Sequence, residues 1–175
     1  SCRFCSFARL QPGDQGAYTM TLDEAWGRLR ARVYAADAIT ELHIVNGLHP
    51  GLPFSYYEEL LRAIKRERPQ LHIKGFTAVE IAYYAEHYGM TITEVLERLV
   101  AAGLGSLPGG GAEVFAERVR RKICADKVDA DGWLAIHRVA HKMGLRSNCT
   151  LLYGHIETVE ERVDHLIQLR ALQDE

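Results

Sequence analysis

The first residues that could carry chemistry are Cys2 and Cys5, two thiols that stand three positions apart in CRFC. Such a pair serves as half of a zinc site, as a redox pair, or as two ligands of an iron–sulfur cluster. Cys124 and Cys149 lie far along the chain and complete no zinc spacing. A redox pair would open a helix, but GDQGAYT separates it from the helix expected near Thr21. The spacing of Cys2 and Cys5 alone does not decide among these three roles.

A glycine-rich stretch, PGGGAE, ends at Glu113 and leads into the basic segment RVRRK. Consecutive glycines cost conformational entropy, and they suit a backbone that approaches a ligand or adopts positive φ. A carboxylate there can bind ribose hydroxyls, and arginines can bind carboxylates through paired hydrogen bonds. A flexible surface turn is the alternative. We favour a ligand-binding loop.

Five histidines raise the question of a metal site: His49, His72, His137, His141 and His155. His137 and His141 are spaced i, i+4, so they share a helix face in the geometry of a two-histidine ligand pair. No Glu follows His137 and no third ligand is near, which favours a solvated or half-buried face. His49 and His155 lie in glycine-flanked loops and are candidates for ligand contact.

Short apolar runs that precede these loops predict strands at 41–46, 71–76, 105–108 and 148–153. Cys149 falls in the last run, and we interpret it and Cys124 as small buried hydrophobes. Helix starts are predicted by capping-box pairs, namely Thr21 with Glu24, Ser55 with Glu58, Thr77 with Glu80, Thr91 with Glu94 and Thr158 with Glu161.

Two further helical features follow from the apolar pattern. A helix is expected over 129–143, with Trp133, Ile136 and Val139 on its inner face and Gly144 at its C-terminal end. An apolar stripe of an amphipathic helix follows Thr158 and consists of Val159, Val163, Leu166 and Ile167.

Alternating strands and helices predict an α/β fold with parallel strands and right-handed crossovers. A barrel and a doubly wound sheet both fit this pattern. Polar and glycine residues follow four different strands, which favours a barrel, because a doubly wound sheet gathers its chemistry at one switch point. We therefore predict a partial (β/α) barrel in a single domain over 1–175, with Asn46, Thr77, Glu113 and His155 at one end of the sheet.

The bulk composition restricts the partners. The formal net charge of the 175 residues is −2, with Lys and Arg interspersed among Asp and Glu, which argues against nucleic acid. No stretch approaches the roughly 20 apolar residues that span a bilayer, and the N-terminus is not a signal peptide. We expect a cytoplasmic protein with reduced thiols that acts on a small molecule, without a membrane partner.

Taken together, the motifs resemble those of radical S-adenosylmethionine (SAM) enzymes, and among them the aminofutalosine synthases of the futalosine route to menaquinone. The stretches that carry the resemblance are CRFCSF, HIVNGLHPGLP, HIKGFTAVEI, SLPGGGAEVFAERVRRKIC and TLLYGHIETVEERVDHL. Cyclic dehypoxanthine futalosine synthases and deazaflavin-forming enzymes share the GGGAE and GHIET-like stretches. The runs KGFTAVEI and YGHIE look more like the synthase than the cyclase.

The resemblance implies a [4Fe–4S] cluster, with SAM as a co-substrate. Cys2 and Cys5 match the second and third cysteines of the family's C-x-x-x-C-x-x-C motif, and the first would precede Ser1. The expected domain is thus a partial radical SAM core without the first strand, the first cluster cysteine and the C-terminal part of the barrel. We expect this chain alone neither to assemble a stable cluster nor to cleave SAM.

The resemblance also implies site residues. Phe4 and the turn that holds His155 and Glu157 would lie near adenine, Asn46 and Gly47 near the methionine amino group, and Glu113 at the ribose. The full set of cofactor-binding candidates is Phe4, Asn46, Gly47, Thr77, Glu113, His155 and Glu157. Substrate candidates, including cations for two carboxylates, are His49, Arg118, Arg120 and Arg121.

The implied reaction adds the 5′-deoxyadenosyl radical to the enol-ether double bond of 3-[(1-carboxyvinyl)oxy]benzoate. Rearrangement and loss of a carboxyl group as bicarbonate give aminofutalosine, and an electron donor such as flavodoxin or ferredoxin is required. One alternative is the cyclic dehypoxanthine futalosine synthase of the same pathway. The other is a non-enzymatic zinc- or nucleotide-binding α/β domain.

Overall fold

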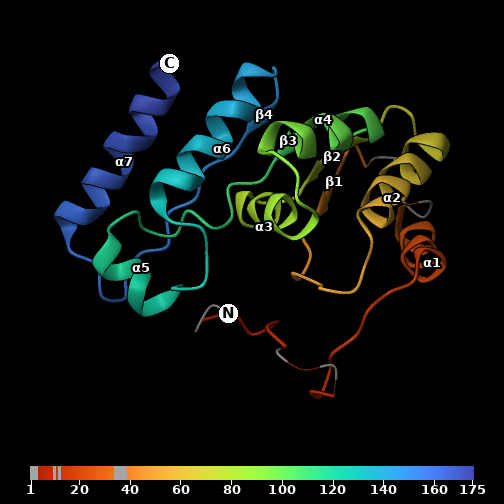
Figure 1. Cartoon of the computed structure of the whole chain (residues 1–175), viewed down its shortest axis with the longest axis horizontal. Helices are drawn as coiled ribbons and strands as arrows, with labels where there is room; N and C mark the ends of the chain where they lie inside the picture. The colour runs from red at the N-terminus through yellow and green to blue at the C-terminus, as the bar shows by residue number, and fades with distance from the viewer. Residues whose placement is uncertain (1–3, 10, 12, 34–38) are drawn as a thin grey trace.

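The computed structural model describes residues 4–9, 11, 13–33 and 39–175 (Figure 1). Its helices and strands, in chain order, are α1 (Leu22–Val33), β1 (Glu41–Ile44), α2 (Phe54–Glu67), β2 (His72–Gly75), α3 (Ala78–Tyr88), α4 (Ile92–Ala102), β3 (Ser106–Leu107), α5 (Glu117–Ile123), α6 (Ala130–Lys142), β4 (Arg146–Ser147) and α7 (Val159–Asp174).

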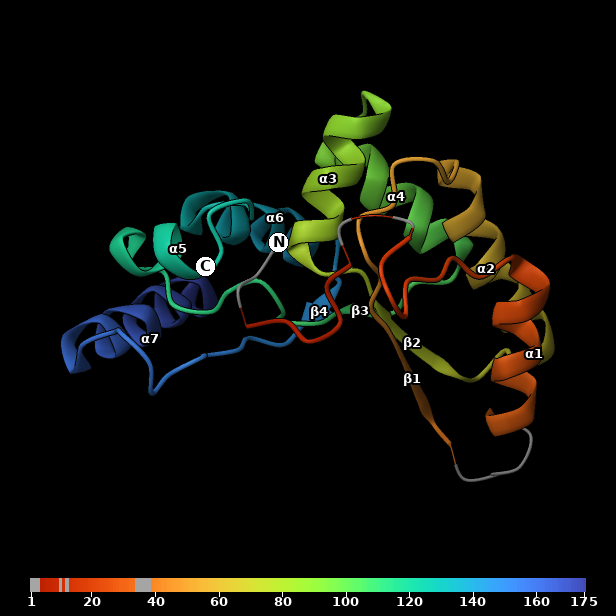
Figure 2. The same ribbon diagram turned by 90° about the horizontal axis from the view of Figure 1, so that it is seen from below.

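The strands form one parallel sheet in the order β1-β2-β3-β4, so each strand pairs with the one before it in the chain. The helices follow one another in the same direction, from α1 and α2 through α3 and α4 to α6 and α7 (Figures 1 and 2). Sequential parallel strands joined by helical crossovers are the arrangement of part of a (β/α) barrel. The predicted α/β fold class is confirmed.

The two faces of the sheet differ in character. Ile73 and Leu107 are fully buried and join the core beneath the helices, where Leu96 and Leu99 of α4 meet the rings of Tyr57, Phe76 and Tyr84. Side chains alternate along a strand, so the residues between them point the other way. That opposite face carries polar side chains and is called the open face below.

Most of the predicted helix starts are confirmed. Thr77, Thr91 and Thr158 each accept a hydrogen bond from the backbone N–H three residues on, and the matching glutamate returns one. Thr21 and Glu24 make the same pair of contacts before α1. These boxes depend on neighbours in the chain alone, which is why the sequence predicts them.

The box predicted at Ser55 is wrong. Helix α2 begins two residues earlier than that box requires, at Phe54, with Pro53 at the N-cap position and no side-chain cap. Glu58 faces away from the helix start and pairs with Arg98 of α4 at 2.6 Å. A tertiary ion pair thus takes the carboxylate that the capping box would need.

The fourth strand is predicted too late in the chain. Residues 41–46, 71–76 and 105–108 contain β1, β2 and β3, but β4 is Arg146–Ser147 and 148–153 carry no strand. Cys149 is therefore exposed rather than packed inside a strand, whereas Cys124 is buried as expected. The segment after β4 runs along the glycine loop, where Thr150 Oγ1 donates to Gly109 O at 2.6 Å.

Helix α6 agrees with the predicted span, with Asp129 as its N-cap and Gly144 at φ 80° just beyond its end. The expectation of a solvated or half-buried His137 is wrong. Its ring is fully buried, stacks on Trp133, and places Nδ1 3.0 Å from Trp133 O. Burial lowers the pKa of His137 to about 4, so the ring is neutral.

Helix α7 shows an unexpected pattern. Val159, Val163, Leu166 and Ile167, the stripe expected to pack, are all exposed, and the buried residues of the helix are His165 and Leu172. Within the described residues, no helix is long and apolar enough to cross a membrane.

Candidate functional site

Loops that follow the four parallel strands meet at the carboxyl end of the sheet. Asn46, after β1, and Thr77, after β2, both donate to the carboxylate of Glu80. A side chain added at Gly110, after β3, would lie 2.9 Å from Thr77 Cγ2, so these two loops touch. The backbone N–H of Leu152, after β4, donates to Glu113 O at 2.9 Å. An unbroken series of contacts therefore joins all four loops.

Glu80 is the centre of the first contact. Its side chain is buried, with Oε1 accepting from Asn46 N and Nδ2 at 3.0 and 3.2 Å. Oε2 accepts from Thr77 N and Oγ1, both at 2.8 Å. Burial raises the pKa of this carboxyl, while the four donors oppose that rise. Glu80 thus fixes the loop after β1 against the start of α3.

Glu113 ends the glycine loop in a strained conformation, at φ 47°, with its side chain buried. Its carboxylate forms an ion pair with Lys127 Nζ. The same ammonium lies 5.6 Å from the centre of the half-exposed Phe4 ring. In both views the segment before α1 lies on the side of the strands' carboxyl ends (Figures 1 and 2). Lys127 therefore connects the CRFC segment to the glycine loop.

The glycine loop is held from below by Arg120. This buried guanidinium donates to Gly111 O and Ala112 O, at 3.1 and 2.6 Å, and also to Val128 O. Gly109 lies so close to the segment after β4 that an added Cβ would stand 2.6 Å from Cys149 Cα. The lack of a side chain at Gly109 thus lets the two backbone segments lie close together, and Arg120 supports the loop by binding its carbonyl groups.

The other two candidate arginines lie on the outside of α5. Arg118 pairs with Glu161 at 2.7 Å and donates to Ile156 O at 2.9 Å. Arg121 forms an exposed pair with Glu117 at 3.4 Å. Arg118 therefore fastens α5 to the turn before α7, and neither guanidinium lies among the contacts that join the four loops.

The turn after β4 is organised by Glu157, whose side chain is fully buried. Its carboxylate accepts from the backbone N–H groups of Gly154 and His155 and pairs with Arg162 at 2.7 Å. The N–H of Gly154, foremost among these donors, lowers the pKa of Glu157 to about 2. Because the carboxylate is turned toward its own loop, Glu157 shapes the turn, and the His155 ring lies 3.0 Å from Leu152 O.

Two candidates in the loop after β1 are partly open. Gly47 is exposed, and nothing lies within 4 Å of where its Cβ would stand. His49 Nδ1 accepts from Gly51 N at 3.0 Å, which curls the loop back on itself. Both residues lie beyond Asn46, so the anchored part of this loop is the part nearest the sheet.

The cysteine motif is described in part. Cys5 is an exposed free thiol in the segment beside Phe4, and Cys2 lies outside the described residues. No group of three or more His, Cys, Asp or Glu side chains in the described ranges could hold a metal ion. A free, solvent-facing thiol next to the loops fits the thiolate donors that an iron–sulfur cluster takes.

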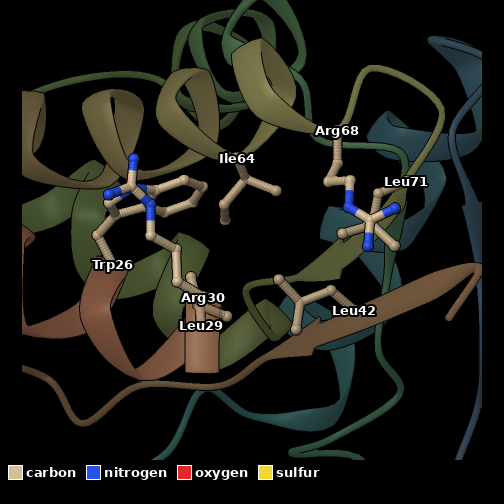
Figure 3. A pocket seen from close by; sticks show the side chains of 7 residues that line it. All are labelled: Trp26, Leu29, Arg30, Leu42, Ile64, Arg68 and Leu71. Atoms are coloured by element: carbon tan, nitrogen blue, oxygen red, sulfur yellow. The ribbon is translucent and has the colours of Figure 1, made fainter. Parts of the chain in front are cut away.

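The pocket in Figure 3 lies elsewhere. Its lining residues come from α1, β1, α2 and the segment between α2 and β2, and its volume is about 10 Å³. That is barely room for one water molecule, and the walls are largely apolar. It is a packing gap and not a ligand site. A wider hollow of about 490 Å³ lies between the start of α1 and Leu52 and Tyr56.

Comparison with known proteins identifies the family. The sequence profile of the Radical SAM superfamily matches residues 1–169. The chain belongs to the radical SAM superfamily. An aminodeoxyfutalosine synthase from Thermus thermophilus is 49% identical over 176 residues, covering 99% of this chain and 46% of the relative. One from Streptomyces coelicolor is 48% identical over 175 residues, covering 100% and 44%.

Other radical SAM relatives carry a different name. A 5-amino-6-(D-ribitylamino)uracil–L-tyrosine 4-hydroxyphenyl transferase from Methanopyrus kandleri is 42% identical over 174 residues, covering 99% of this chain and 46% of the relative. The chain spans about half the length of the curated relatives it matches. Membership in this superfamily of enzymes decides against the non-enzymatic zinc- or nucleotide-binding alternative.

Three residues of this candidate site are not predicted from the sequence. Glu80 was visible only as a capping residue, and Lys127 stands in no motif. His165 accepts from Phe115 N at 3.3 Å and contacts Thr150 O at 3.0 Å, so it links α7 to both neighbouring loops. Each contacts residues that are distant in the sequence, so a pattern of neighbouring residues does not predict the contact.

Proposed function

We propose that this chain is the SAM-binding part of an aminofutalosine synthase. The observation that carries the proposal is the series of contacts that joins four strand-end loops, in a chain 49% and 48% identical to two aminodeoxyfutalosine synthases. The transferases match at lower identity, 42% for the one described above. The cyclase remains the second candidate within the pathway.

The roles proposed for the residues are those that the family resemblance implies. Asn46 and Gly47 receive the methionine amino group, Thr77 flanks it, and Glu113 binds the ribose hydroxyls. Phe4 and His155 border the adenine, while Glu157 keeps the turn beside it in shape. Cys2 and Cys5 would hold two irons of the [4Fe–4S] cluster, which when bound would supply the electron for cleavage of the S–C5′ bond of SAM.

Cleavage of SAM would release methionine, and its 5′-deoxyadenosyl group would add to the enol-ether double bond of 3-[(1-carboxyvinyl)oxy]benzoate. Rearrangement with uptake of water and loss of a carboxyl group as bicarbonate would then give aminofutalosine. His49 is a candidate for substrate contact at the mouth of the loop after β1. Of the three arginines, Arg120 supports the glycine loop, Arg118 holds the turn before α7, and Arg121 lies farthest outside. A flavodoxin or ferredoxin supplies the electron.

The test uses the full-length enzyme that contains this chain, reconstituted with iron and sulfide and reduced with dithionite. It is offered SAM with 3-[(1-carboxyvinyl)oxy]benzoate, with dehypoxanthine futalosine, or with tyrosine and the ribityl-aminouracil, and products are identified by mass spectrometry. Aminofutalosine from the first mixture alone supports the proposal. A product from either of the others overturns it.

The role of Glu113 has its own test. In that enzyme Glu113→Ala removes two charge-assisted hydrogen bonds of roughly 1.5–3 kcal/mol each, and SAM affinity falls while iron content is unchanged. Glu117→Ala, a neighbouring exposed carboxylate, is the control. Unchanged affinity in Glu113→Ala would leave Glu113 with the structural role of pairing with Lys127.

A further inference from the structure

The open face of the sheet carries an uninterrupted row of polar side chains. The strand register aligns His43 with Lys74, Lys74 with Ser106, and Ser106 with Arg146, so four adjacent strands each contribute one residue to the same level. A row of this kind in a sheet buried on both faces would be unusual, since such strands are normally apolar throughout. We call these four residues the polar row.

The orientation of the row follows from the neighbours of each residue. Leu107 is fully buried in the core beneath the helices, and Ser147 Oγ contacts His141 of α6 at 2.8 Å, so both face the helices. Ser106 and Arg146 precede them and therefore face the opposite way. Ser106 Oγ lies 2.7 Å from Nε2 of His72, which is two positions before Lys74 on β2.

The polar row carries more positive than negative charge, and a nearby carboxylate balances only part of it. Glu41, the nearby carboxylate, pairs with Lys74 at 2.9 Å and with His43. Lys74 is held in place by this pair and is largely buried, with 15% of its side chain exposed. Arg146 is exposed, and in the part of the chain that the structure describes no hydrogen bond or ion pair engages its guanidinium.

The row lies directly below the site. His43 and Lys74 each precede the loop residues Asn46 and Thr77 by three positions, about 10 Å along a strand. The three arginines first considered for substrate carboxylates lie elsewhere: Arg120 beneath the glycine loop, and Arg118 and Arg121 on the outside of α5. A guanidinium and an ammonium at the same level of one sheet face suit a carboxylate well.

We propose that the polar row, through Lys74 and Arg146, binds the ring carboxylate of the aryl substrate. This assignment rests on the proposed function. The enol-ether end must reach the deoxyadenosyl carbon held by the loops, so the benzoate carboxylate points the other way, down the open face. Ser106 and His43 supply further hydrogen-bonding groups at the same level, and Glu41 orients the ammonium of Lys74.

The test compares Lys74→Met and Arg146→Met in the full-length enzyme with Lys142→Met, an exposed lysine at the end of α6 that loses the same charge. We expect the KM for 3-[(1-carboxyvinyl)oxy]benzoate to rise at least tenfold in the first two variants, with the Kd for SAM unchanged. With 2-phenoxyacrylate, which lacks the ring carboxylate, the same variants should match the wild type.

A binding measurement separates this inference from the proposed function. Calorimetry with 3-methoxybenzoate, an unreactive benzoate, reports the carboxylate site without any turnover. Weaker binding in Lys74→Met and Arg146→Met, but not in Lys142→Met, supports the polar row even if the enzyme forms no aminofutalosine. Equal KM and equal benzoate affinity in all variants of an enzyme that does form aminofutalosine would overturn it.

Discussion

Helices α3 and α4 begin with the same Thr-x-x-Glu box, and the two boxes have different surroundings. At α4, Glu94 is exposed, its carboxylate binds Thr91 alone among the described residues, and the backbone N–H of Thr91 lowers its pKa. At α3, Glu80 is buried and also binds Asn46, 34 residues away along the chain. One motif therefore only caps a helix, while the other caps a helix and fastens a loop of the site.

The two boxes differ because the glutamate of the α3 box also binds a loop outside its helix. Oε2 of Glu80 serves the cap, and Oε1 is left over for the loop after β1 because the strand end brings Asn46 within reach. Burial then makes each of the four hydrogen bonds costly to lose, since the donors have no water to replace the carboxylate. Substitutions at Glu80 and Glu94 separate the effect of fastening the loop from the effect of capping the helix.

The largest expected effect is that of Glu80→Gln. The amide keeps one acceptor oxygen but turns its NH₂ group toward two buried donors, so we expect the free energy of unfolding to fall by about 2–4 kcal/mol. Urea denaturation measures it. Amide exchange at 46–51 should quicken as well, and unchanged protection there would show that Glu80 only caps α3.

The second prediction is a difference in pH dependence. Burial raises the folded-state pKa of Glu80 above the unfolded value, so between those two values the folded state holds more protons and stability falls as pH rises, by at most about 1.4 kcal/mol per unit. The pKa of Glu94 is lowered, so its contribution is present above the unfolded pKa and is lost as pH falls through the folded pKa.

The measurement is urea unfolding from pH 2.5 to 8 for the wild type, Glu80→Gln and Glu94→Gln. In Glu80→Gln the free energy of unfolding should rise more steeply with pH than in the wild type. In Glu94→Gln it should depend less on pH at the acid end of the range. The same change of slope in both variants would contradict the opposite pKa shifts.

Third, a double-mutant cycle between Asn46→Ala and Glu80→Gln should give a coupling free energy of about 1 kcal/mol, because the two side chains share a hydrogen bond. The readout is again the free energy of unfolding. The cycle between Asn46→Ala and Glu94→Gln is the control and should be additive. Additivity in both cycles would mean that the contact contributes nothing to stability.

The smallest effect belongs to Glu94→Gln, which weakens one exposed box and should lower the free energy of unfolding by about 0.5 kcal/mol. Amide exchange at 46–51 should match the wild type. A loss as large as that of Glu80→Gln would remove the distinction between the two boxes.

The sequence predicted what depends on near neighbours. The boxes at Thr21, Thr77, Thr91 and Thr158 are local and were found, and the strand–helix alternation gave the parallel sheet. The box at Ser55 failed because Glu58 is drawn to Arg98 on another helix. The fourth strand was misplaced because 148–153 follow the glycine loop through single hydrogen bonds, such as that from Thr150 to Gly109 O, without forming a ladder.

The candidate site divides in the same way. Glycines and polar residues after strands marked the loops, and the structure brings Asn46, Thr77 and Glu113 into one series of contacts. Lys127 and the polar row were not found, since their positions depend on strand register and on contacts across the fold. Residue type alone also misjudged His137, whose ring is buried against Trp133.

The strand order has a consequence for how the chain folds. Each strand pairs with its predecessor, so every ladder can close as soon as its crossover helix has formed. Parallel sheets fold slowly when the paired strands are far apart in the chain, because the entropy of closing the loop is lost before the strand contacts form. Pairing each strand with the one before it keeps every loop short. We expect assembly to proceed strand by strand during synthesis, from β1 toward β4.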